Sequence, residues 1–240
     1  MKYYPMKFLK EDPSVGNADS AEDAKESIQL LEMRATALRE QLVEMSDGRQ
    51  PLRRADLLVA LGRLLIRLEK MLEAWDVGRE AFDLYAAEDA WEGAVQACDI
   101  LFLTERPGSL TALGNGVWLA VTFPVDPELS VAILQHIVDE TPSDADGAAV
   151  AAATALYIVD LRAQGAQRED LLIYTNQVLA TVARRHSQTA SQDDFDRWSR
   201  ELELNDPAAF LPRLGQVLDV IVQDDWWFDR DALQGALPVH

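Results

Sequence analysis

Apolar residues recur at helical spacing along most of this chain, and this pattern constrains the fold more than any other feature. From Ser20 to Met45 an apolar side chain falls every three or four residues, and Ser20 followed by an acidic turn is a typical helix start. This stripe consists of Ile28, Leu31, Ala35, Leu38 and Leu42. The segment Leu52 to Leu68 has a broader apolar face, which indicates burial on more than one side. The pattern predicts an all-α protein built from antiparallel helical hairpins.

Short breaks separate the expected helices. After the first two, they cover approximately residues 72–86, 90–101, 127–140, 144–163, 168–185, 193–204, 207–222 and 229–237. The Ala-rich helix at 144–163 is apolar almost all round, so we expect it to be central and buried. Residues 1–19 show no clear period and are expected to form an extended arm. Residues 20–240 are expected to form a single helical domain, with a subdivision near 105–109 left open.

Residues 99–124 have two interpretations. They contain the breaks Pro107-Gly108 and Gly114-Asn115-Gly116 between short apolar stretches. One interpretation places helix ends around the Pro-Gly break. The alternative is a small β meander in which Asn115-Gly116 forms a type I′ hairpin turn. Because the surrounding sequence is helical, helices are the preferred interpretation.

The charge of the chain restricts its partners. Acidic residues number 41 against 22 Lys and Arg, which gives a net charge of −19. Residues 71–240 hold 29 acidic residues and 10 basic ones, all arginine. Such a field disfavours nucleic acids and anionic membrane surfaces, whereas it accommodates a basic protein. No apolar stretch reaches the roughly 18 residues of a membrane span, no leader peptide is recognised, and there is one cysteine, so we expect a cytoplasmic protein.

Small residues in two adjacent predicted helices stand where paired helices need to approach closely. They are Gly62, after Leu61, and then Ala74 and Ala81. The segment from Ala90 to Leu103 would open a second unit of the same kind. On these positions, residues 55–103 resemble a tetratricopeptide-type (TPR-like) helical repeat. The resemblance implies helical hairpins and a surface that binds a partner protein.

The sequence contains no recognisable catalytic, metal-binding or cofactor-binding motif. The three histidines, His136, His186 and His240, stand far apart, and no Cys/His pair has the spacing of a zinc site. The segment 143–147 lacks ligands for a calcium loop, and we interpret it as the N-cap of the Ala-rich helix. Cys98 lies on an apolar helical face and is expected to be a buried thiol. We therefore predict no catalytic residues, no metal and no cofactor.

The segment from Asp224 to Asp231 is the main candidate site. It contains three consecutive aromatic residues, which cannot all face one core from a single helix or strand. Aromatic residues surrounded by carboxylates suit a basic and hydrophobic partner. In the alternative, the aromatic residues fold back and cap the helices. The candidate contact residues are Trp226, Trp227, Phe228, Asp224 and Asp225, together with Tyr3, Tyr4 and Phe8 of the arm.

Three hypotheses for function follow. The preferred one is a non-enzymatic protein–protein interaction module, such as an adaptor, scaffold or assembly chaperone. The alternative is an enzyme or small-molecule-binding protein with a pocket between helices. The residues that would line this pocket are Trp118, His136, Tyr157 and Tyr174. The third hypothesis is a homo-oligomer in which the helix at 20–45 pairs with its copy.

Overall fold

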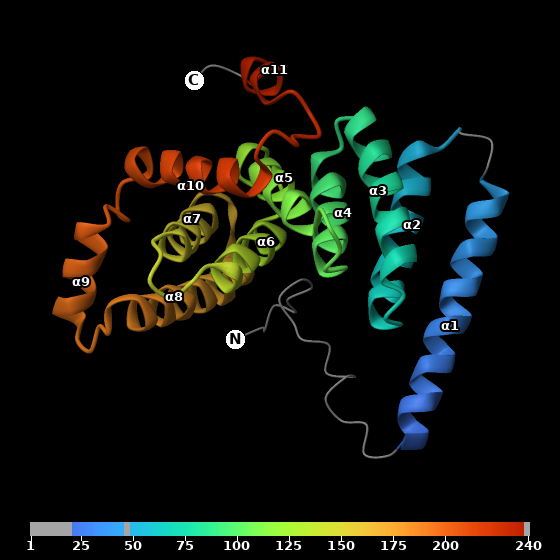
Figure 1. Cartoon of the computed structure of the whole chain (residues 1–240), viewed down its shortest axis with the longest axis horizontal. Coiled ribbons are helices and arrows are strands. Elements are labelled where there is room, and N and C mark those ends of the chain that lie inside the picture. Colours follow the sequence, from blue (N-terminus) through green and yellow to red (C-terminus); the bar gives the residue numbers. More distant parts are fainter. Residues whose placement is uncertain (1–20, 46–48, 238–240) are drawn as a thin grey trace. The chain divides into compact units, whose positions relative to one another are not determined.

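The structure, a computed structural model, describes residues 21–45 and 49–237, with side chains described from residue 27 onward. In this part of the chain there are eleven helices and no strand, which confirms the predicted all-α fold (Figure 1). The helices are α1 (Ala21–Glu44), α2 (Pro51–Arg67), α3 (Met71–Ala87), α4 (Trp91–Leu103), α5 (Ser109–Thr122), α6 (Pro127–Glu140), α7 (Gly147–Arg162), α8 (Gly165–Ser187), α9 (Gln192–Glu201), α10 (Pro207–Val222) and α11 (Arg230–Gly235). The predicted arm at 1–19 lies outside the described residues.

The β meander considered for residues 99–124 is wrong, because both parts of this segment are helical. Helix α4 continues to Leu103, and α5 runs through Gly114-Asn115-Gly116 without a turn. The Asn115 side chain donates to the carbonyl of Thr111, 2.9 Å away and one turn earlier, so it stays within the helix. The break lies instead at Gly108, whose φ of +93° favours glycine. Residues 112–120 are all buried, and a buried helix resembles a buried strand in sequence.

The helices group into two compact units that divide within α5, between Leu119 and Ala120. In the unit before this point, α1 packs on α2, α2 on α3 and α3 on α4, while α2 also contacts α4. Small residues allow this close packing, because a Cβ at Gly62 would lie 3.0 Å from the Ile100 side chain and one at Gly78 would lie 3.1 Å from Leu101. Gly62, one of the small positions found in the sequence, therefore lies at a helix contact, and so does Gly78, which is not one of those positions.

Two of the turns between these helices share one geometry. In the first, the Lys70 N–H donates to the carbonyl of Leu65, and in the second the Ala90 N–H donates to the carbonyl of Tyr85, both at 2.9 Å. Glu69 and Asp89 adopt the left-handed φ values of 56° and 53° that close such a turn. Glu69 and Asp89 thus take the positive-φ position at the ends of α2 and α3 that glycine often occupies.

Helix α1 packs through Leu31, Ala35 and Leu42, but Ile28 of the predicted stripe is 52% exposed. The reason is length, since α1 has 24 residues and α2 has 17. Glu32 is paired at 2.7 Å with Lys70, which lies in the turn after α2. The residues of α1 before Glu32 therefore extend past the end of α2 (Figure 1).

Tyr85 links α3 to α2 through its hydroxyl, which donates to Asp56 at 2.6 Å. Burial, and after it the Asp56 carboxylate, raise the pKa of Tyr85 well above that of an exposed tyrosine. The stabilisation from the protonated hydroxyl is complete below the unfolded-state pKa of about 10 and is lost as the pH rises through the folded-state pKa. We expect Tyr85 to be the last tyrosine to ionise, as followed by phenolate absorbance of wild type and Tyr85→Phe. The difference between the two titrations gives the ionisation of Tyr85 itself. If this difference has the midpoint of an exposed tyrosine, the prediction is contradicted.

In the unit that follows Leu119, α7 is the central helix, as predicted. Its residues from Ala148 to Ala155 are all buried, and α6, α8 and α10 pack around it (Figure 1). Alanine side chains allow three neighbours to approach one helix. The Asp126 carboxylate caps α6 by accepting from the backbone N–H groups of Glu128 and Leu129 at 2.8 and 3.3 Å.

Arg162, the last residue of α7, joins this helix to the end of α5. Its two terminal nitrogens donate to the carbonyls of Ala120 and Val121, each at 2.7 Å. A weaker bond of 3.5 Å reaches the carbonyl of Val125. Burial lowers the pKa of the Arg162 guanidinium. This cation thus binds carbonyls of the last turn of α5, which make no bonds within a helix and where the helix dipole favours positive charge.

None of the helices in the described ranges is long and apolar enough to cross a membrane.

Candidate functional site

The segment 224–231, called here the aromatic–acidic segment, connects α10 to α11. Gln223 ends α10 with a left-handed φ of 56°, and residues 224–229 then run without regular structure. Asp224 and Asp225 are exposed, whereas Trp226, Trp227 and Phe228 are all half-buried. The structure therefore places the five predicted contact residues at the surface, with the aromatic rings partly accessible.

Arg230 organises the aromatic–acidic segment. Its guanidinium carbon lies 3.7 Å from the ring centroid of Trp226, and its Nη1 donates to the Asp219 carboxylate at 2.8 Å. The same indole ring meets Phe228 in an edge-to-face arrangement, with 6.1 Å between ring centroids and 61° between planes. Two aromatic residues and one cation thus form a cluster beside the last turn of α10.

Helix α11 contributes no buried side chain. Its first turn is capped by Asp229, which accepts from the backbone N–H of Ala232 at 3.0 Å. Since hydrophobic burial is the main source of stability in most helices, α11 gains little stability from packing on the rest of its unit.

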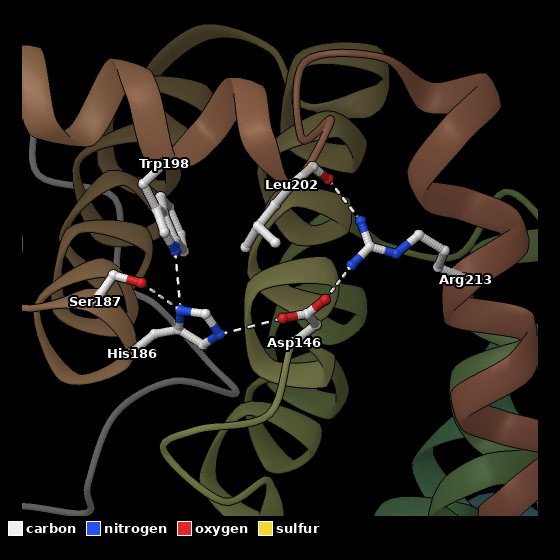
Figure 2. A network of polar contacts seen from close by, with 6 residues as sticks. All are labelled: Asp146, His186, Ser187, Trp198, Leu202 and Arg213. Carbon is white, nitrogen blue, oxygen red and sulfur yellow. Dashed lines mark hydrogen bonds and ion pairs between the residues drawn. The ribbon is translucent and has the colours of Figure 1, made fainter.

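A second cluster of polar side chains joins α7, α8, α9 and α10 (Figure 2). Asp146, just before α7, bonds with one oxygen to His186 Nε2 at 3.2 Å and with the other to Arg213 at 2.7 Å. Arg213 also donates to the carbonyl of Leu202, which ends α9. From α9, the Trp198 indole N–H donates to His186 Nδ1 at 3.1 Å.

These contacts define the proton position on His186. An indole N–H can only donate, so Nδ1 is the acceptor and the proton sits on Nε2, which donates to Asp146. The Ser187 hydroxyl lies 2.7 Å from the same Nδ1, which gives the residue types of a hydrolase triad. However, the buried indole already uses the lone pair that would have to accept the serine proton. We therefore interpret the cluster as a structural link between four helices.

Asp146 corrects one detail of the sequence analysis. It occupies the N-cap position of α7, but its side chain makes no cap hydrogen bond. Its carboxylate instead binds His186 and Arg213, which come from helices distant in sequence. The N-cap interpretation of residues 143–147 thus identified the helix start but not the role of the acid.

Replacing Asp146 by alanine should lower the free energy of unfolding by about 1 kcal/mol, because both of its ion pairs are partly exposed to solvent. Chemical denaturation measures this loss. Asp144→Ala is the matched control, since it removes an exposed acid two residues earlier in the chain. Equal stabilities of the two variants would show that the link contributes nothing.

The residues of the alternative pocket lie on separate helices. Trp118 is buried in α5, His136 is half-buried in α6, and Tyr157 meets Phe210 edge-on with 6.0 Å between centroids. Tyr174 lines a small depression between α6 and α8, whose other lining residues are Gln135, Gln177, Val178, Thr181, Val182 and Arg185. Burial and the nearby Asp139 raise the pKa of Tyr174. Tyr3, Tyr4 and Phe8 lie outside the described residues.

In the described part of the chain, no group of three or more His, Cys, Asp or Glu side chains lies close enough to hold a metal ion. Cys98 is fully buried, and its burial raises the pKa of the thiol, which keeps it protonated.

A scan of known protein families and searches of curated proteins and solved structures find no match to this chain.

Sequence reasoning missed the roles of Asp146, His186, Trp198 and Arg213. His186 is 40 residues from Asp146, and Arg213 is 67 residues from it. An isolated histidine and an isolated arginine carry no local signal of such a link. Arg230 lies within the predicted segment, but a spacing of four residues indicates a contact only inside a helix, and Trp226 lies in none.

Proposed function

We propose that this chain is a non-enzymatic protein–protein interaction module, an adaptor, scaffold or assembly chaperone, that binds a basic partner through its acidic helical surface. The aromatic–acidic segment is the main contact. One observation carries the proposal: Trp226, Trp227 and Phe228 are adjacent, half-exposed and flanked by the exposed carboxylates of Asp224 and Asp225.

The energetics of binding favour this segment over the rest of the surface. Tryptophan and other aromatic side chains supply much of the binding energy in protein interfaces, because they bury a large area at little cost in conformational entropy. Partly exposed rings have apolar area left to bury. Since α11 adds no buried side chain, a partner that covers this region would also stabilise it.

Long-range electrostatics favour a basic partner. From residue 120 to the C-terminus there are 20 acidic residues and eight arginines. Such an excess attracts a positively charged protein and accelerates its association, and salt screens this attraction. We therefore expect binding to weaken as salt is raised.

The TPR-like resemblance of residues 55–103 supports the same class of function. Helices of that type pack as consecutive hairpins and present a surface to a partner. In this chain the corresponding helices α2, α3 and α4 pack in sequence order, with Gly62 and Gly78 at their contacts. A TPR-like binding role for this unit remains part of the proposal.

Affinity capture from the native lysate at low and moderate salt tests the proposal. The bait is the wild-type chain, and Trp226→Ala/Trp227→Ala is the test variant. Leu161→Ala/Ile173→Ala is the matched control, because these side chains are apolar and 64% and 60% exposed on α7 and α8. We expect a stoichiometric basic protein that the control retains and the test variant loses. Equal capture by all three baits would remove the aromatic–acidic segment from the proposal.

A further inference from the structure

Arg230 lies over the ring of the half-buried Trp226. We infer that Trp226 and Asp219 together form a receptor for an arginine side chain of the partner, and that Arg230 fills this receptor until the partner displaces it. This inference rests on the proposed function, since it names the chemical group that the aromatic–acidic segment recognises.

The geometry matches a guanidinium group in two ways. The guanidinium carbon is 3.7 Å from the ring centroid of Trp226, which is the distance of a stacked planar cation. The same group donates from Nη1 to the Asp219 carboxylate at 2.8 Å. A planar cation with donors at its edge can stack on a ring and bond to a carboxylate at once, whereas the ammonium of lysine has no face to stack. The receptor therefore selects arginine over lysine.

Arg230 is held in a way that allows displacement. The Arg230 side chain is 32% exposed and that of Asp219 is 56% exposed, so an incoming residue can reach both groups. Ion pairs with this exposure contribute little stability. Because α11 buries no side chain, moving Arg230 away disturbs no core packing.

The carboxylates around the receptor favour a partner that carries further positive charges besides the bound arginine. Asp224 and Asp225 precede Trp226 in sequence, Asp229 and Asp231 flank Arg230, and all four carboxylates are exposed. A partner arginine that takes the place of Arg230 keeps the stacking and the Asp219 pair, and the rest of a basic partner gains these carboxylates. Arg230 lowers the apparent affinity because it reduces the fraction of receptors that are open.

Calorimetric titration of the full chain with a short peptide of alternating arginine and leucine tests this inference. The comparison probe is the same peptide with lysine in place of arginine. Removal of the internal competitor in Arg230→Ala should raise the affinity for the arginine peptide by about two- to tenfold. Trp226→Ala should abolish binding. Arg197→Ala, which removes an exposed arginine paired with Asp194 on α9, is the matched control and should bind like wild type.

A second measurement does not depend on how the variants fold. In the wild-type chain, addition of the arginine peptide should move the Arg230 side-chain Nε–H resonance to the position typical of solvent-exposed arginine. Binding that leaves this resonance unchanged would overturn the displacement. Equal affinity for the lysine peptide, or no gain in Arg230→Ala, would overturn the arginine receptor.

The two proposals fail in different ways. If neither peptide binds while the lysate partner still depends on Trp226 and Trp227, the arginine receptor is wrong and the interaction module stands. If the arginine peptide binds as expected but no cellular protein depends on these residues, the receptor stands and the proposed function is wrong.

Discussion

Replacement of Arg162 by methionine should lower the free energy of unfolding by about 3 kcal/mol, the largest effect we expect from one substitution. The guanidinium donates to two carbonyls at the end of α5 and more weakly to Val125. Methionine fills a similar length without any donor. The carbonyls of Ala120 and Val121 then lose a charged partner that water replaces only in part.

Chemical denaturation measures this loss against two further variants. Arg168→Met removes an arginine paired with Asp160 at the exposed start of α8, where the expected loss is below about 1 kcal/mol. Arg162→Lys keeps the charge but not the forked donors, so it should lie between wild type and Arg162→Met. If Arg162→Met and Arg168→Met are equally stable, Arg162 does not hold the end of α5.

Gly93→Ala should destabilise the chain by about 2 kcal/mol. A Cβ at this position would lie 2.3 to 2.6 Å from three ring carbons of Tyr85. The ring cannot simply move aside, because Tyr85 is buried and its hydroxyl is bonded to Asp56 at 2.6 Å. The new methyl group therefore forces α4 away from α3 or breaks the Tyr85 hydrogen bond.

Gly215→Ala provides the control for this prediction. Gly215 lies in the middle of α10, and a Cβ there would meet nothing within 4 Å. The same chemical change should therefore stabilise the chain by about 0.5 to 1 kcal/mol, because alanine is the better helix former. In a Tyr85→Ala background, Gly93→Ala should lose its cost. Thermal or chemical unfolding that gives both glycine variants the same sign would contradict the contact between Gly93 and Tyr85.

The helices could be predicted from the sequence because their signals are local. The apolar spacing in α2, the Pro127 that begins α6 and the Ala-rich composition of α7 each depend on a few neighbouring residues. In the buried helix α5, local signals are not sufficient to predict the secondary structure. Its valines and its Asn-Gly pair are equally compatible with a hairpin, and only the surrounding helices decide the outcome.

Contacts between distant residues could not be predicted in the same way. Arg162 binds carbonyls 41 and 42 residues earlier in the chain, and no pattern in a single sequence marks such a pair. The candidate site was more accessible to prediction, since three adjacent aromatic residues cannot share one core. The cation that stacks on Trp226 became visible only when the side chains were placed.

Site-specific photo-crosslinking in the native cell tests the central claim most directly. A photoreactive residue replaces Asp225 in the aromatic–acidic segment, and a second variant carries it at Asp193, an equally acidic and exposed position on α9. We predict that position 225 crosslinks a discrete basic protein and that this product disappears in a Trp226→Ala/Trp227→Ala background. If position 225 gives no crosslinked product beyond that formed at position 193, this result contradicts a role for the segment in binding a partner.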